Sequence, residues 1–233
     1  MFLLIAVFSL VQVAYGVPLD TEKTQTNLSS DNPSQASRIE SFTIEMPQIE
    51  GRTKSIQLSL PPDYDPSDTS YHVFYLQAGQ YLFNPPPEAV GDYKIDETLD
   101  ELFFEGATEG IIVVGIELDY DNPWDEYSPW INENMHDWVN PNNHSAVVGG
   151  EGFEFIEFIV NTLKSEIDSR YRTLPDRENT ATGGFCRGGL IPILAGLMHP
   201  EVFSGVMAMS PTVWLAERGG EWLSDNQLIN FMN

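Results

Sequence analysis

Two early stretches of the chain alternate apolar and polar residues, which predicts a pair of half-buried strands. The first covers residues 39–46 and the second residues 56–60, with Gly51 between them. A short connection that contains glycine is typical of neighbouring antiparallel strands. We therefore expect the domain to begin with an antiparallel pair.

Three later runs are continuously apolar, which is typical of strands buried on both faces. They cover residues 72–77, 110–115 and 203–210. Residues 94–105 and 152–165, which lie between these strands, carry apolar side chains at helical spacing. Strands that alternate with helices predict an α/β fold with a doubly wound, mostly parallel sheet.

The most informative stretch is NTATGGFCRGG, residues 179–189, which is followed by the apolar run 190–197. Small β-forming residues lead into paired glycines and then into a helical pattern, the order found in a nucleophile elbow, Gly-x-Nuc-x-Gly. Gly184, Cys186 and Gly188 occupy its three positions. So tight a strand-to-helix turn favours glycine at the flanks and exposes the central residue at a helix N-terminus, where negative charge is stabilised.

Such elbows usually carry serine, whereas Cys186 is the only cysteine of this chain. A thiolate is intrinsically more nucleophilic than a hydroxyl, and the start of a helix favours the thiolate. The alternative is that Cys186 is a small, buried and inert apolar residue. Pro192 lies inside the following helix, so we expect the start of that helix to be short or distorted.

Together with the elbow, the phrases RYRTLPDRENTATGG, AGLMHPEVFSGVMAMSP and EYSPW resemble the putative-esterase branch of the α/β-hydrolases, from about residue 38 to residue 214. That branch includes enterochelin-esterase-like enzymes and relatives of the mycobacterial mycolyltransferases. The resemblance implies acyl transfer from an ester without a cofactor, with Cys186 at the nucleophile position. It also implies an oxyanion hole formed by the backbone N–H groups of Gln80 and Arg187. Family members often carry Asp where this chain has Ala78, a mild departure because a backbone donor does not need that side chain.

Ester hydrolysis by this architecture needs an acid and a histidine, which follow the nucleophile in that order. After Cys186 the sequence offers His199, which lies in the elbow helix where a structural role is expected, and several acids with no histidine behind them. These acids are Glu201, Glu217, Glu221 and Asp225. We therefore expect an incomplete triad and a sheet that lacks the C-terminal strands of the fold.

Charge limits the partners of the protein. Its 233 residues include 35 acidic and 11 basic ones, a formal net charge of −24. This balance makes nucleic acid and anionic membrane surfaces poor partners, since few residues could neutralise phosphates. The charge either keeps a secreted protein soluble or attracts divalent cations and matrix polymers. The acidic loop 117–126 lacks the glycine of a calcium loop, so we expect it to be mostly solvated, with weak divalent binding and no dedicated metal site.

Residues 1–16 are predicted to be a secretory signal peptide, residues 17–37 a flexible polar leader and residues 38–233 a partial α/β-hydrolase domain. The first apolar run is too short to span a bilayer, and no later run is long enough. A single cysteine cannot form an internal disulfide. Glycosylation sequons at Asn27 and Asn143 are compatible with a secreted, extracellular protein.

Three functions remain open on the sequence. The protein is an esterase-like hydrolase that uses Cys186, with weak or no ester hydrolysis because its triad is incomplete. Alternatively it keeps the fold and a pocket but only binds an ester of a small molecule or polymer. In the third case it is an acidic component of an extracellular matrix or a biomineral, and its charge carries the function.

Overall fold

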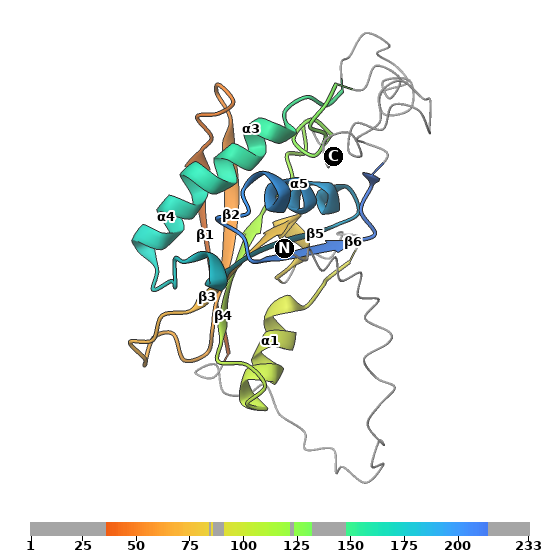
Figure 1. Cartoon of the computed structure of the whole chain (residues 1–233). Coiled ribbons are helices and arrows are strands. Elements are labelled where there is room, and N and C mark those ends of the chain that lie inside the picture. The colour runs from red at the N-terminus through yellow and green to blue at the C-terminus, as the bar shows by residue number, and fades with distance from the viewer. Residues whose placement is uncertain (1–35, 84, 86–90, 122–123, 132–147, 214–233) are drawn as a thin grey trace.

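The computed structural model describes residues 36–83, 85, 91–121, 124–131 and 148–213 of the chain. These residues form a six-stranded sheet in the order β1-β2-β4-β3-β5-β6, with helices packed on both of its faces (Figure 1). The strands are β1 Arg38–Glu45, β2 Thr53–Leu60, β3 His72–Gln77, β4 Ile111–Ile116, β5 Thr180–Phe185 and β6 Gly205–Met209.

The sheet is mixed. β1 and β2 form the antiparallel hairpin that the alternating pattern predicts, and β2 also pairs antiparallel with β4. From β4 through β3 and β5 to β6 every pairing is parallel. The prediction of a mostly parallel α/β sheet is therefore confirmed. Parallel strands end at the same edge of a sheet, so the loops that follow these four strands meet along one edge.

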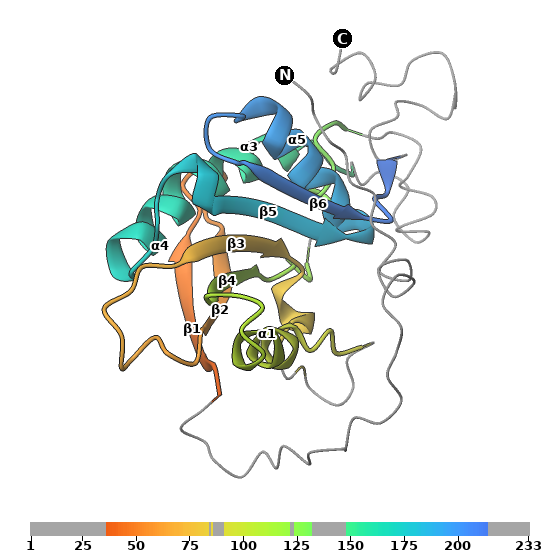
Figure 2. The ribbon, with the colours of Figure 1, turned by 60° about the horizontal axis from the view of Figure 1, so that its bottom comes forward.

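Helices cover the two faces unequally, as Figure 2 shows: α3, α4 and α5 lie on one face and α1 lies on the other. The helices are α1 Ile95–Phe104, α3 Gly152–Glu157, α4 Lys164–Arg170 and α5 Leu190–Met198. The π-helical segment η2, Phe158–Leu163, joins α3 to α4. The helix predicted for residues 152–165 therefore continues to Arg170, with one wider turn inside it.

Each face of the sheet has its own hydrophobic core. The larger cluster joins β2, β3 and β4 to α3, α4 and α5 through side chains such as Leu58, Tyr75 and Phe155. The smaller cluster includes Leu76 and Val113, against which Leu99 of α1 packs. This burial on both faces explains why β3 and β4 read as continuous apolar runs in the sequence.

Candidate functional site

The turn between β5 and α5 brings Cys186 to the surface at the carboxyl edge of the sheet. β5 ends at Phe185, the 3-10 turn η4, Cys186–Gly189, follows, and α5 begins at Leu190. Cys186 has a backbone φ of 52° and is exposed. Non-glycine residues rarely adopt a positive φ, which costs energy and therefore marks a position fixed by its surroundings. The alternative that Cys186 is buried is wrong, and the predicted irregular start of the helix is confirmed as η4.

The two flanking glycines of this turn are required by close backbone packing. A Cβ atom on Gly184 would lie 2.2 Å from the carbonyl oxygen of Gly188, and one on Gly188 would lie 2.8 Å from Cβ of Gln77. Both distances are far shorter than real carbon contacts, so neither position has room for a side chain. The elbow is thus pressed against the end of the neighbouring strand β3.

The turn after β3 lies beside the elbow and is strained as well. Ala78 has a φ of 62° and precedes the 3-10 turn η1, Gly79–Tyr81. A Cβ atom on Gly79 would lie 2.5 Å from the backbone carbon of Gly115 in β4, so this turn packs directly on the neighbouring strand. Gln80, the predicted oxyanion donor, lies on this turn, and its side-chain Oε1 accepts a hydrogen bond from the Leu118 N–H at 3.0 Å.

The immediate surroundings of the sulfur come from the segment after β6. The hydroxyl of Thr212 donates a hydrogen bond to Sγ of Cys186 at 3.6 Å, and the Thr212 N–H donates to the Cys186 carbonyl at 2.9 Å. Two histidines belong to the described residues and both lie elsewhere. His72 begins β3, at the opposite edge of the sheet, and His199 at the end of α5 contacts Glu157 at 3.0 Å.

Aromatic rings contact both sequence neighbours of Cys186, Phe185 and Arg187. The guanidinium of Arg187 lies 4.3 Å from the centre of the Trp124 ring, a cation–π contact. The ring of Phe185 stacks on Tyr93 with centroids 4.7 Å apart. Arg187, predicted as the second oxyanion donor through its N–H, therefore lies directly after Cys186 with its side chain directed to the loop that follows β4.

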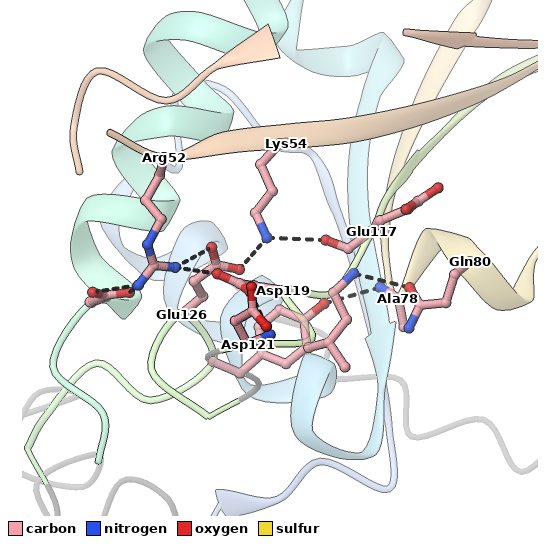
Figure 3. Close-up of polar contacts among 11 residues, drawn as sticks. Arg52, Lys54, Ala78, Gln80, Glu117, Asp119, Asp121 and Glu126 are labelled. Atoms are coloured by element: carbon pink, nitrogen blue, oxygen red, sulfur yellow. Dashed lines mark hydrogen bonds and ion pairs between the residues drawn. The ribbon is translucent and has the colours of Figure 1, made fainter. Parts of the chain in front are cut away.

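The acidic loop after β4 is folded onto two basic residues of β2 and the hairpin, as Figure 3 shows. Lys54 donates to the carbonyl oxygen of Glu117 at 3.1 Å and pairs with the carboxylate of Glu126; the two paired side chains are only 3% and 1% exposed. Arg52 contacts Asp119, Glu126 and Glu151. The prediction of a mostly solvated loop is therefore wrong for Asp119 and Glu126, whose carboxylates pair with internal cations, whereas Asp121 is exposed as expected.

Burial dominates the electrostatics of this loop. Desolvation raises the pKa of Glu126, although the ammonium of Lys54 acts in the opposite direction. The next residue, Tyr127, is fully enclosed, and burial raises the pKa of its phenol, so the hydroxyl stays neutral. Its oxygen accepts a hydrogen bond from the Ala78 N–H at 3.1 Å.

Sequence reasoning missed Lys54 and Thr212, and it included Tyr127 only as part of the phrase EYSPW. A signal for the first was present: Lys54 lies two residues before Ile56 in an alternating strand, so it points into the same core. The described residues contain no group of three or more His, Cys, Asp or Glu side chains that could hold a metal ion. The predicted signal peptide, most of the leader and both sequons, Asn27 and Asn143, lie outside the described residues.

In the part of the chain that the structure describes, no helix has the length and apolar character needed to cross a membrane.

Comparison with known sequences identifies a relative. The chain is 26% identical over 157 residues to the uncharacterized protein YbbA of Bacillus subtilis (strain 168), an alignment that covers 67% of this chain and 56% of YbbA. It thus spans little more than half of the length of that relative.

Solved structures share the fold. The BES protein from Bacillus cereus matches with a TM-score of 0.59 and 16% identity, over 90% of this chain and 69% of that one. The enterobactin esterase FES from Shigella flexneri matches with a TM-score of 0.58 and 14% identity, over 83% of this chain and 41% of that one. Residues 48–232 match the sequence model of the family described as putative esterase. The family predicted from the phrases around the elbow is confirmed, and the chain belongs to the putative esterase family.

Proposed function

We propose that this protein is a secreted, esterase-like acyl-transfer protein in which Cys186 accepts the acyl group of an ester. The sulfur attacks the carbonyl carbon, the C–O bond to the alcohol breaks, and the alcohol leaves with the thiol proton. Water then hydrolyses the thioester, releases the acid and restores the thiol. The observation that carries the proposal is the exposed Cys186, at φ 52°, at the carboxyl end of β5.

Two features of the edge support the first half of this reaction. The N–H groups of Gln80 and Arg187 belong to turns that follow the adjacent parallel strands β3 and β5, so both turns border the place where an oxyanion would form. Backbone donors fixed in advance are an effective means of stabilising that charge. The turn η4 also places a helical N-terminus directly after the sulfur, which favours negative charge there.

The second half of the reaction is expected to be slow. Hydrolysis of a thioester needs a base that activates water. The two described histidines are committed elsewhere: His72 lies at the opposite edge, and the His199 ring contacts Glu157 and Glu201 at 3.0 and 3.2 Å. We therefore propose acylation of Cys186 with weak net hydrolysis.

Rapid mixing with p-nitrophenyl acetate tests this proposal. We expect a burst of about one equivalent of p-nitrophenol per protein, followed by a slow phase, as for an accumulating acyl-enzyme. Intact mass should rise by one acetyl group, and peptide mapping should place it on Cys186. Cys186→Ala should abolish the burst, with Cys186→Ser as the matched variant that keeps a nucleophile. A burst that persists in Cys186→Ala, or no release above buffer, would contradict the proposal.

Binding of divalent cations or matrix polymers is a second candidate function. It is favoured by the net charge of −24, the excess of 35 acidic over 11 basic residues. Many described basic side chains, such as Arg52, Lys54 and Lys164, are already paired with acids inside the molecule. Titration calorimetry with calcium should show binding that Cys186→Ala leaves unchanged.

Secretion itself is tested by N-terminal sequencing of the exported protein, which should begin after Gly16.

A further inference from the structure

We infer that Tyr127 is a positioning residue that holds the strained turn carrying the amide of Gln80, and that the buried Lys54–Glu126 pair holds Tyr127 in place. This inference rests on the proposed function, since it assigns the contacts that shape the proposed oxyanion site. It concerns residues that do not themselves touch the reacting atoms.

The turn after β3 needs an external contact because its backbone is strained. Ala78 adopts a left-handed conformation, with φ 62° and ψ 47°, which costs an L-residue about 1–2 kcal/mol. Such a conformation persists only where neighbouring groups determine it. A change at Ala78 would rotate the peptide planes that follow, including the one that carries the Gln80 N–H.

Tyr127 contacts both the strained turn and the elbow. Its hydroxyl oxygen accepts the Ala78 N–H at 3.1 Å. Its ring lies against the elbow, because a Cβ atom on Gly188 would be 3.5 Å from Cε2 of Tyr127. The ring also lies beside Phe155, with centroids 5.9 Å apart. One rigid side chain thus links the two backbone segments that would surround an oxyanion.

A second contact comes from the same loop. The Leu118 N–H donates to Oε1 of Gln80 at 3.0 Å, so the loop after β4 contacts the turn at Ala78 and at Gln80. Two contacts on residues two apart fix both the position and the direction of the turn. The loop after β4 therefore holds the turn after β3 in place. How firmly it does so depends on how the loop itself is fixed to the rest of the fold.

Lys54 provides that attachment at both ends of the acidic loop. Its ammonium donates to the carbonyl of Glu117 at 3.1 Å and pairs with the carboxylate of Glu126, the residue before Tyr127 (Figure 3). The two side chains of the pair are almost completely buried. A buried pair is weak evidence for stability, but it specifies one geometry because either charge alone would be costly.

Two reactions of Cys186 separate a role in positioning from a general effect on folding. Acylation by p-nitrophenyl acetate passes through an oxyanion, whereas alkylation by iodoacetamide is a direct displacement without one. A displaced oxyanion turn should therefore slow acylation and leave alkylation unchanged. Damage to the elbow itself should slow both reactions.

The test compares Tyr127→Phe with Tyr75→Phe. Both remove a hydroxyl from a fully buried ring, but the Tyr75 hydroxyl has no hydrogen-bond partner among the described residues. We expect Tyr127→Phe to slow single-turnover acylation roughly tenfold or more, somewhat below the loss of a complete oxyanion donor. Alkylation should stay within about twofold, and Tyr75→Phe should leave both rates unchanged. Equal slowing of both reactions, or unchanged acylation in Tyr127→Phe, would overturn the inference.

Two further measurements apply if the wild-type protein is not acylated or if Tyr127→Phe does not fold. If the wild-type protein is not acylated, the proposed function fails, and amide hydrogen exchange of residues 78–82 decides the inference: exchange there should be faster in Tyr127→Phe than in Tyr75→Phe, and equal exchange refutes it. If Tyr127→Phe does not fold, Glu126→Gln keeps a hydrogen bond to Lys54 while removing the charge. It should slow acylation severalfold with alkylation unchanged, and no difference between the two reactions would contradict the inference.

Discussion

Thr212 contacts Cys186 twice: its hydroxyl donates to the sulfur at 3.6 Å and its N–H donates to the Cys186 carbonyl at 2.9 Å. Thr212 is itself buried, so the segment after β6 is fixed to the elbow by a side chain that has little freedom. The pair of contacts orients the sulfur and places a donor beside it. A donor at this place stabilises negative charge on sulfur.

Thr212→Val should slow the reactions of Cys186 without unfolding the protein. Valine keeps the shape of threonine but cannot donate to the sulfur. We expect alkylation by iodoacetamide at pH 7 to fall roughly two- to fivefold, since one hydrogen bond of this kind contributes about 1 kcal/mol and part of that gain is offset by lower nucleophilicity. Thr212→Ser should retain the rate. Equal rates for the valine and serine variants would show that the hydroxyl has no role.

Gly184→Ala should destabilise the fold severely, because the new methyl group would meet the Gly188 carbonyl at 2.2 Å. Backbone cannot move aside as a flexible side chain can, so we expect a loss of at least about 3 kcal/mol in the free energy of unfolding. Gly51→Ala is the control: it has a φ of 75° but nothing within 4 Å of its Cβ, and it should cost only about 1 kcal/mol. Urea denaturation measures both. Similar losses for the two variants would contradict the close packing of the elbow.

Lys54→Met should destabilise the protein by up to about 3–5 kcal/mol, since it removes the nearer cation from the buried carboxylate of Glu126 and leaves only the longer contact to Arg52 at 3.4 Å. The double variant Lys54→Met with Glu126→Leu removes both charges and should recover most of the loss. Thermal unfolding of the single and double variants checks this. A double variant no more stable than Lys54→Met would show that the pair does not govern the stability of this region.

Asp96→Asn should stabilise the protein at neutral pH but not in acid. Desolvation first, and then the charge of Glu97, raise the pKa of the buried Asp96 above 3.8, the value for a free side chain. The folded state therefore binds this proton more tightly, and the resulting stability is fully present below about pH 3.8 and is lost as the pH rises through the folded pKa. The melting temperature of Asp96→Asn should exceed that of the wild type at pH 7, and the difference should vanish near pH 3. The variant Glu101→Gln, at an exposed position of the same helix, should show no such gain. A pH-independent gain in Asp96→Asn would contradict the assignment.

Local patterns predicted the framework well. The hairpin, the strand at residues 72–77 and the turn at Cys186 follow from the pattern of apolar and polar residues and from the spacing of glycines. Both can be recognised within a few neighbouring residues. The family followed from phrases around the same bend. The helix predicted to end at residue 165 continues to Arg170, and its π-helical segment at residues 158–163 was not predicted.

The support of the candidate site could not be predicted in this way. Lys54 and Glu126 are 72 residues apart, and Tyr127 is 49 residues from Ala78. No local pattern records which distant residues a parallel sheet brings to one edge. Asp119 and Glu126 of the 117–126 loop were predicted to be solvated for the same reason, since their partner cations, Arg52 and Lys54, belong to the β1–β2 hairpin.

The close contact between Gly184 and Gly188 involves backbone atoms alone. The shape of the bend is therefore independent of which side chain residue 186 carries, as long as that side chain is small. A codon for cysteine and one for serine differ by a single base, so evolution can exchange sulfur and oxygen chemistry here without remodelling the scaffold. The same backbone turn can therefore present either a thiol or a hydroxyl at residue 186.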